Sequence, residues 1–307
     1  MTPLRLGLDL GGSRSKWHLL RGETTLAHGF APPLTAALLG TPGGQASLAA
    51  LTGALPARPD WVHAGLPGFG PGRPDAADLH ARLAAALGLH PERVRLESDL
   101  VLAYRAHFRP GEGVLVYAGT GSLACHLAAD GTLLRAGGHG YHIDDDGAGY
   151  ALGRAALRWV TGQLDQGRDP QGPLAEEVRG VAGGLDWDTL RHLAYHAPGA
   201  AAVATLAPAV GRAADRGDAA AQAMLRDAAH ALAALARTVQ ARLPAPRPTV
   251  VSGGALRVSA RFESALALAL PGMSVAFRDH AVAAARLAGP SVVFPTAGQP
   301  DLDHDEQ

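Results

Sequence analysis

The sequence predicts an α/β protein with two domains, each built on a mixed β-sheet with helices on its faces. Each half of the chain opens with two apolar strand patterns around a glycine-rich turn, and alternating strand and helix patterns follow. The length of 307 residues also suits two domains of ordinary size. The repeat lies in the order of the elements and not in residue identity, so we interpret it as a weak internal repeat.

The first half shows a β-β-β-α-β-α order. Residues 4–30 predict strands around the first glycine turn, and a loop rich in proline and glycine leads to a helix near 45–54. Residues 61–68 predict a short buried strand that ends in a loop, and residues 76–87 an Ala/Leu-rich helix. A strand over 93–99 and a helix over 100–107 complete the first domain, which we place at residues 1–108.

The second half begins again at Gly113 with the second glycine hairpin. A third strand at 133–136, a glycine-dense segment at 137–149, several helices up to residue 243, a strand at 249–254 and a helix at 261–270 follow. We place the second domain at residues 109–290. Its last helix, about 279–290, is expected at the periphery, where it could pack back on the first domain. Residues 291–307 form an acidic tail that we expect to be disordered.

The two glycine turns are candidate phosphate sites. The first contains Gly11, Gly12 and Ser13, and the second contains Gly119, Thr120, Gly121 and Ser122. Glycine lets an anion approach the backbone closely, and the turn directs N–H groups and hydroxyls toward it. One such turn is usually only a hairpin, whereas two of them favour a nucleotide site. Lys16, the one lysine of the chain, either contacts phosphate or points into solvent.

Composition excludes several classes of protein. The 27 basic and 28 acidic residues balance, so the chain lacks the positive charge expected of a nucleic-acid-binding protein. Cys125 is the single cysteine, which excludes intramolecular disulfides and cysteine-ligated zinc or iron–sulfur sites within one chain, and we expect it to be buried. There is no apolar signal region or membrane-spanning run, so we expect a cytoplasmic protein without membrane contacts.

Two aspartates stand where strand patterns end. Asp9 comes just before Gly11 and Gly12 and could hold Mg²⁺, which offsets charge on the β- and γ-phosphates, or could simply cap the turn. Asp99 is a candidate general base that accepts the proton of an attacking hydroxyl. Its alternative role is the N-cap of the helix beginning at Leu100. An asparagine at position 99 should preserve a cap but abolish a base.

Six short motifs occur in a fixed order along residues 4–290. They are Asp9-Leu-Gly-Gly-Ser-Arg-Ser, Ser98-Asp99, Ala118-Gly-Thr-Gly-Ser, Gly137-Gly-His-Gly-Tyr, Asp145-Asp-Gly-Ala-Gly and Val251-Ser-Gly-Gly. This ordered set resembles the BadF/BadG/BcrA/BcrD-type ATPases, and within them the N-acetylglucosamine kinases and glucosamine kinases. The resemblance implies the actin/Hsp70/sugar-kinase fold, with two RNase H-like domains and a nucleotide cleft between them. It also implies an ATP-dependent kinase that uses Mg²⁺ and phosphorylates an amino sugar.

The resemblance implies a role for each motif. The two glycine turns correspond to the phosphate loops, Asp99 to the catalytic base, and Gly253 and Gly254 to the adenosine motif, where a bulky side chain would collide with the nucleoside. The segment 137–149 corresponds to the loop that receives the sugar, with Asp145 in the place of a carboxylate that binds sugar hydroxyls. The candidate sugar-binding residues are Thr35, Gly138, His139 and Asp145.

The sugar positions depart from the family pattern, so the identity of the sugar stays open. The usual Gly-Asp-Glu-Gly-Ser is here Asp144-Asp-Asp-Gly-Ala148, His139 stands where a Trp is common, and residues 33–40 lack the usual Asn. The extra carboxylate of Asp144 would favour a cationic amino sugar, which points to glucosamine over its N-acetyl form. Three adjacent carboxylates could also form a second metal site, although acidic loops are more often solvated.

Two alternatives belong to other functional classes. An ATPase that drives a partner protein, like the activators of 2-hydroxyacyl-CoA dehydratases, would need cluster-binding cysteines that Cys125 cannot supply. A degenerate kinase could serve as a sugar- or nucleotide-binding protein, but a regulator of this fold would need a DNA-binding segment before the first turn, where only residues 1–5 stand. The Ala-rich helices at 200–243 would suit a homodimer surface or a packed core equally.

Overall fold

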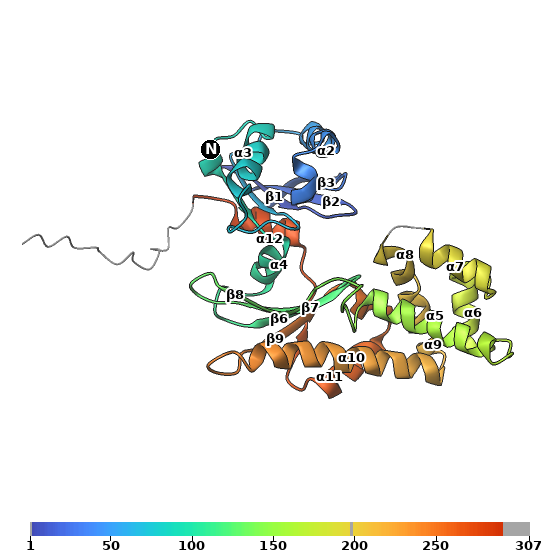
Figure 1. The fold of residues 1–307 in the computed structure, drawn as a ribbon. Helices are drawn as coiled ribbons and strands as arrows, with labels where there is room; N and C mark the ends of the chain where they lie inside the picture. Colours follow the sequence, from blue (N-terminus) through green and yellow to red (C-terminus); the bar gives the residue numbers. More distant parts are fainter. Residues whose placement is uncertain (1, 197–198, 291–307) are drawn as a thin grey trace, which may run out of the picture. The chain divides into compact units, whose positions relative to one another are not determined.

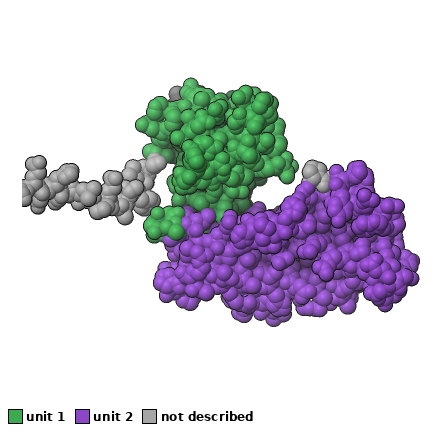
Figure 2. Space-filling model, viewed as in Figure 1, with its two compact units in different colours: residues 1–110, 129–132, 278–307 green, residues 111–128, 133–277 purple. Residues whose placement is uncertain are grey.

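The computed structural model describes residues 2–196 and 199–290 and divides into two compact units. Unit 1 consists of residues 1–110, 129–132 and 278–307, and unit 2 of residues 111–128 and 133–277 (Figure 2). The predicted acidic tail at 291–307 lies outside the described residues.

The sheet of unit 1 has five strands in the order β3-β2-β1-β4-β5. Their bounds are β1 Leu4–Asp9, β2 Ser15–Arg21, β3 Thr24–Ala31, β4 Trp61–Gly65 and β5 Val94–Glu97. The first three strands form an antiparallel meander, and β4 and β5 run parallel to β1. Because β1, β4 and β5 are parallel, their carboxyl ends meet at one edge, where functional residues of such sheets commonly gather.

Helices cover both faces of this sheet. They are α1 Ala36–Leu39, α2 Pro42–Gly53, α3 Ala76–Ala86, the 3₁₀ turn η1 Pro91–Arg93, α4 Asp99–His107 and α12 His280–Leu287. In Figure 1, α2 and α3 lie on one face, and α4 and α12 lie on the other. The contact between α12 and β1 is very close, since a Cβ built on Gly7 would lie 1.9 Å from the Ala281 carbonyl oxygen.

The last helix therefore belongs to the core of unit 1 and not to its periphery. It contacts β1, β2, β4 and α4, and its residues Ala281, Ala284 and Ala285 are fully buried. Small side chains on the helix and a glycine on the strand let the two backbones approach each other, which explains why an alanine-rich segment serves here.

The sheet of unit 2 repeats the topology of unit 1, in the order β8-β7-β6-β9-β10. The strands are β6 Val114–Ala118, β7 Ser122–Leu127, β8 Leu133–Gly137, β9 Thr249–Ser252 and β10 Ser274–Val275. Again three strands form an antiparallel meander, and two more run parallel to the first. This confirms the predicted fold class. The weak internal repeat in the order of the predicted elements corresponds to a repeat of strand topology.

The helices of unit 2 build one large apolar core. They are α5 Gly149–Asp165, α6 Pro173–Ala182, α7 Trp187–Tyr195, α8 Ala200–Ala204, α9 Ala207–Asp215, α10 Ala219–Gln240, the 3₁₀ turn η2 Gly254–Val258 and α11 Ala260–Ala269. The longest, α10, packs on β6, β7 and β8 and contacts α9 and α11 (Figure 1).

The alanine-rich helices α9 and α10 pack into this core through their buried faces. The fully buried residues of α10 include Ala221, Ala229, Leu232, Ala233 and Ala236. Core packing accounts for this alanine richness. Cys125 is also fully buried, and burial raises the pKa of its thiol to about 12. Within the described residues, no helix combines the length and apolarity needed to cross a membrane.

Candidate active site

Asp9 and Asp99 both stand at the carboxyl edge of the parallel strands of unit 1. Asp9 is the last residue of β1 and pairs with Gly65 of β4, and Gly65 pairs in turn with Glu97 of β5. Asp99 opens α4 two residues beyond Glu97. A Cβ on Gly65 would lie 3.2 Å from the Asp99 Cα atom, so this glycine lets the start of α4 approach the strand ends.

Ser98, and not Asp99, is the N-cap of α4. The Ser98 side-chain oxygen accepts a hydrogen bond of 3.1 Å from the Val101 N–H, and Asp99 is the first residue inside the helix. A capping side chain satisfies one of the orphan N–H groups of the first turn. Since Ser98 performs this task, the Asp99 carboxylate is not required as a cap.

The Asp99 carboxylate lies in a partly desolvated position. Burial raises its pKa, although backbone N–H groups at the start of α4 and the nearby His280 oppose the rise. A raised pKa makes a carboxylate a better proton acceptor, because proton-transfer efficiency rises with basicity.

A buried network fixes the strand that leads to Asp99. His63 on β4 is fully buried, and its Nε2 atom lies 2.8 Å from Glu97 Oε1. The Arg105 Nε–H of α4 donates to Glu97 Oε2 at 3.0 Å. Burial alone would raise the pKa of Glu97, but the His63 hydrogen bond and the neighbouring arginines hold it below its ordinary value. The network therefore joins β4, β5 and α4 close to the start of α4.

Asp9 is surrounded by both signs of charge. Burial raises its pKa, the carboxylates of Asp99 and Asp279 raise it further, and His280 and Lys16 oppose the rise. The His280 Nδ1 atom lies 3.6 Å from Asp9 Oδ2. Mg²⁺ in nucleotide sites is usually held by one or two carboxylates and by the phosphates themselves. The Asp9 side chain is partly exposed and lies near the carboxylates of Asp99 and Asp279, so it fits such an ion.

Lys16 is paired with Asp279 at the start of α12. Its Nζ atom lies 2.6 Å from Asp279 Oδ2, and each side chain is about one third exposed. Burial opposes ionisation of Asp279, but the Lys16 hydrogen bond and N–H groups of α12 hold the pKa of Asp279 below its ordinary value. Lys16 therefore forms an ion pair with Asp279 and does not extend freely into solvent.

The first glycine turn is exposed at its tip. Gly12 and Ser13 are exposed, whereas Gly11 is held by its carbonyl oxygen, which accepts from the Leu34 N–H at 3.0 Å. A Cβ on Gly11 would lie 2.4 Å from the Arg14 carbonyl oxygen, so the tight turn requires glycine there. The Arg14 guanidinium lies over the Phe30 ring, 4.0 Å from its centroid.

Thr35 lies beside this turn and caps α1. Its methyl carbon would be 3.9 Å from a Cβ on Gly12, and its Oγ1 accepts from the Leu38 N–H at 3.3 Å. Unit 1 therefore brings together Asp9, Asp99, Lys16, Thr35 and the first turn.

The second glycine turn, in unit 2, is braced by Asp145. The Ser122 N–H donates to Asp145 Oδ1 at 2.9 Å, and a Cβ on Gly121 would lie 2.3 Å from that oxygen. Asp145 is buried and is the one non-glycine residue of the described chain at positive φ, 70°. Burial raises its pKa, opposed mainly by the Ser122 hydrogen bond. The carboxylate that the resemblance assigns to the sugar thus also orders the second glycine turn.

The remaining bonds of the second turn tie it to α5. The N–H groups of Gly149 and Tyr150 donate to the carbonyl oxygens of Gly119 and Thr120, each at 2.9 Å. Within the described part of the chain, no protein acceptor takes the N–H of Thr120 or Gly121. Two backbone donors at the tip therefore remain for an anion.

The glycine-rich loop that follows β8 is closed by His139 and Asp144. The His139 N–H donates to Asp144 Oδ1 at 2.9 Å, and His139 Nδ1 lies 2.5 Å from Asp144 Oδ2. Gly138, at φ 74°, lies against the Leu123 side chain. In the described ranges no group of three His, Cys, Asp or Glu residues is placed to hold a metal ion, so the acidic run at 144–146 does not form the second metal site that we considered.

Gly253 and Gly254 differ in what a side chain would meet. Gly253 has φ 117°, and a Cβ there would lie 2.2 Å from the Ala118 carbonyl oxygen. Gly254, the first residue of η2, has open space around the corresponding position. The protein backbone itself therefore requires glycine at 253, and only at 254 could a bound nucleoside be the reason.

The two related sheets, each with a glycine hairpin after its first strand, define a protein with the two-domain sugar-kinase fold of the actin-like group. The chain belongs to the BadF/BadG/BcrA/BcrD ATPase family, whose model matches residues 6–275. No curated protein matches the sequence.

Several solved structures are similar to this chain. A protein of Chromobacterium violaceum, provisionally named an N-acetylglucosamine kinase, is 29% identical, with a TM-score of 0.72 and coverage of 94% of this chain and 99% of that one. A provisionally named N-acetylglucosamine kinase of Porphyromonas gingivalis is 18% identical, with a TM-score of 0.68 and coverage of 92% and 97%. A Streptomyces griseus glucokinase of the ROK family, in complex with glucose and AMPPNP, is 18% identical, with a TM-score of 0.59 and coverage of 93% and 99%. The last two likenesses concern the fold.

Sequence reasoning missed Asp279 and His280 as neighbours of Asp9. They lie about 270 residues away in the chain, at the start of a helix that we expected at the periphery. An Asp at the N-cap of a predicted helix was the available signal, and it indicated a cap without indicating which strand the helix would cover.

Proposed function

We propose that the protein is an ATP-dependent kinase that phosphorylates an amino sugar, glucosamine or N-acetylglucosamine. The observation that carries the proposal is the environment of Asp99. It is a carboxylate with a raised pKa, freed from capping by Ser98, at the strand edge that also holds Asp9. The family of ATPases to which the chain belongs and the 29% identical relative support the same class of reaction.

In the proposed mechanism, Asp99 accepts the proton of the sugar hydroxyl as that hydroxyl attacks the γ-phosphate of ATP in line. The N–H groups of Thr120 and Gly121 and the exposed tip at Gly12 and Ser13 donate to phosphate oxygens as charge spreads over them. Asp9 would hold Mg²⁺, which supplies charge neutralisation at the β- and γ-phosphates when bound. Gly254 leaves room for the nucleoside.

We assign the sugar to the loop residues Gly138, His139 and Asp145 and to Thr35. Asp145 has one carboxylate oxygen on the Ser122 N–H, and its second oxygen could accept from a sugar hydroxyl. Asp144 bonds to His139, so its charge is partly offset within the loop. A preference for glucosamine over its N-acetyl form therefore requires the His139–Asp144 pair to open, so that the Asp144 carboxylate can meet the amino group of the sugar. Unchanged turnover of both sugars in an Asp144→Ala variant would contradict such a preference.

The proposal is tested by sugar-dependent ADP release from Mg-ATP. The acceptor panel contains glucosamine, N-acetylglucosamine, N-acetylmuramic acid, its anhydro form and glucose. We expect release that depends on one of the amino sugars. Release that ignores every sugar would favour an ATPase that drives a partner protein, and the absence of release would favour a binding protein.

A further inference from the structure

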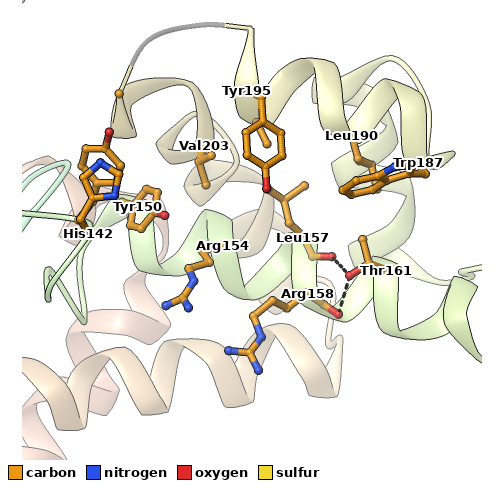
Figure 3. A pocket seen from close by; sticks show the side chains of 13 residues that line it. His142, Tyr150, Arg154, Leu157, Arg158, Thr161, Trp187, Leu190, Tyr195 and Val203 are labelled. Carbon is orange, nitrogen blue, oxygen red and sulfur yellow. Dashed lines mark hydrogen bonds between the residues drawn. The ribbon is translucent and has the colours of Figure 1, made fainter.

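Charged side chains gather in a cavity of unit 2 and at the start of α12 in unit 1. The cavity has a volume of about 540 Å³, and its lining includes Arg154, Arg158, Trp187 and Tyr195. Figure 3 shows both guanidinium groups extending away from the two rings, so the cavity does not direct charge and rings at one ligand. At the start of α12, by contrast, two consecutive side chains contact the strands that flank the first glycine turn.

The first glycine turn is closed by Asp9 and Lys16. Asp9 is the last residue of β1, and Lys16 lies opposite it on β2, so this pair of the ladder is the nearest to the turn. The Lys16 Nζ atom lies 2.6 Å from Asp279 Oδ2. The His280 Nδ1 atom lies 3.6 Å from Asp9 Oδ2. Two consecutive residues of one helix start therefore hold both ends of the turn.

The helix that carries these contacts is fixed against β1. A Cβ on Gly7 of β1 would lie 1.9 Å from the Ala281 carbonyl oxygen and 2.2 Å from the Ala285 backbone nitrogen. Ala281 and Ala285 are fully buried. Backbones in such direct contact cannot shift past each other without collisions. The residues just before Ala281 therefore stand in a defined place beside the end of β1.

The two carboxylate oxygens of Asp279 have separate tasks. The Oδ1 atom accepts from the Ala281 N–H at 3.1 Å and from the Val282 N–H at 3.3 Å, and so it caps α12. The Oδ2 atom pairs with the Lys16 ammonium. The cap thus fixes the carboxylate, and the fixed carboxylate determines where the lysine charge lies.

Lys16 keeps donors for a phosphate even though it is paired. An ammonium group has three N–H donors, and the Asp279 oxygen takes one of them. The Lys16 side chain is 34% exposed. Its charge matters at this edge, because Asp9, Asp99 and Asp279 lie close enough to interact and would repel an approaching polyphosphate.

We propose that Asp279 is a positioning residue for the ATP phosphates. It holds the Lys16 ammonium at the mouth of the first glycine turn, while His280 holds Asp9 on the neighbouring strand. This inference rests on the proposed function, since it needs a nucleotide at the turn. The lysine is oriented before ATP arrives, which reduces the entropy lost on binding. Asp279 acts through Lys16 and does not itself meet the nucleotide.

The test is isothermal titration of the full chain with Mg-AMPPNP, a non-hydrolysable analogue of ATP, without sugar. Asp279→Asn keeps an oxygen for the cap of α12 and replaces the oxygen that pairs with Lys16 by an NH₂ group. We expect the Kd of this variant to rise by about tenfold, because a charged hydrogen bond no longer orients the lysine. Its Tm should change by no more than about 2 °C, since partly exposed ion pairs contribute little to stability.

Three further variants assign the effect to the Lys16–Asp279 pair. Lys16→Met leaves the cap of α12 intact and should raise Kd by about tenfold or more. In the Lys16→Met background, Asp279→Asn should not weaken binding further, because the two residues act as one unit. A residue that only supports folding would show no such dependence on Lys16. Asp78→Asn, which removes the exposed ion pair with Arg82 on α3, should leave Kd unchanged.

Three results, with a parent that binds the analogue, would overturn the proposal. They are an Asp279→Asn variant that binds as tightly as the parent or more tightly, a Lys16→Met variant that binds as tightly as the parent, and an undiminished effect of Asp279→Asn in the Lys16→Met background. These results would leave the proposed kinase activity standing. A parent that does not bind Mg-AMPPNP would instead overturn the proposed function together with this inference.

Discussion

Replacement of Asp99 by asparagine separates the chemical role of this residue from a structural one. Asn retains the size and hydrogen-bonding capacity of the side chain but cannot accept the proton of a sugar hydroxyl. General bases contribute a factor of about 10²–10⁴ to the rate, which corresponds to roughly 3–5 kcal/mol of transition-state stabilisation. We therefore expect kcat of Asp99→Asn to fall by about 10²–10⁴, with little change in KM for ATP.

Folding stability should not fall in Asp99→Asn. Burial raises the pKa of Asp99, so the native state disfavours its ionised form. The contribution of a carboxyl group with a raised native pKa declines as pH rises above its ordinary value of 3.8. At neutral pH the substitution removes that unfavourable contribution, and thermal unfolding should occur at an equal or slightly higher temperature.

Ser98→Ala is the matched control, because it removes the cap and keeps the carboxylate. It should cost about 1 kcal/mol of stability and lower the Tm by roughly 2–4 °C, while sugar-dependent turnover stays close to that of the parent. The assays are coupled ADP release and thermal unfolding by circular dichroism. The reasoning is refuted if Asp99→Asn keeps kcat within tenfold of the parent, or if it lowers the Tm as much as Ser98→Ala does.

Three further predictions concern unit 2 and α4. Gly253→Ala should lose about 2 kcal/mol or more of stability, since it adds a Cβ at φ 117° beside the Ala118 carbonyl oxygen. Gly254→Ala should fold normally and raise KM for ATP. Urea unfolding should therefore detect the Gly253 variant, and steady-state kinetics with varied ATP should detect the Gly254 variant. Asp145→Asn should preserve the second turn, because Asn accepts a hydrogen bond and tolerates positive φ. Asp145→Ala should lower the free energy of unfolding by about 1–3 kcal/mol, because the Ser122 N–H loses its acceptor. Equal unfolding midpoints for the two variants would contradict this prediction. Burial lowers the pKa of the partly exposed His107 to about 4. The free energy of unfolding should therefore fall by about 1–2 kcal/mol as pH falls from 6.5 toward 4, a value already reduced for solvent screening. His107→Asn should reduce this pH dependence in urea unfolding.

The sequence was most informative where local chemistry determines structure. Glycine turns between apolar strands predicted both hairpins, β1–β2 and β6–β7, and a strand ending near Ser98 and Asp99 predicted the start of α4. These features depend on neighbouring residues, since turns and caps are set within a few positions.

Contacts between distant segments could not be predicted. The pairing of Lys16 with Asp279 joins residues 263 positions apart, and the bond from Ser122 to Asp145 joins a turn to a loop 23 residues later. Periodicity and capping say which face of a helix is apolar but not which strand it covers. The sequence analysis considered Asp99 as the N-cap of this helix, and only the hydrogen bond from the Val101 N–H to the Ser98 side chain identifies Ser98 as the cap.

The destination of the γ-phosphate tests the central claim most directly. The parent protein is incubated with Mg-ATP and the amino sugar that gives the fastest ADP release, and phosphorus NMR follows the products. The account predicts that the phosphate appears on the sugar, one for each ADP formed, with little inorganic phosphate. If inorganic phosphate equals ADP and no sugar phosphate forms, the protein hydrolyses ATP without a sugar acceptor, and the kinase assignment is wrong.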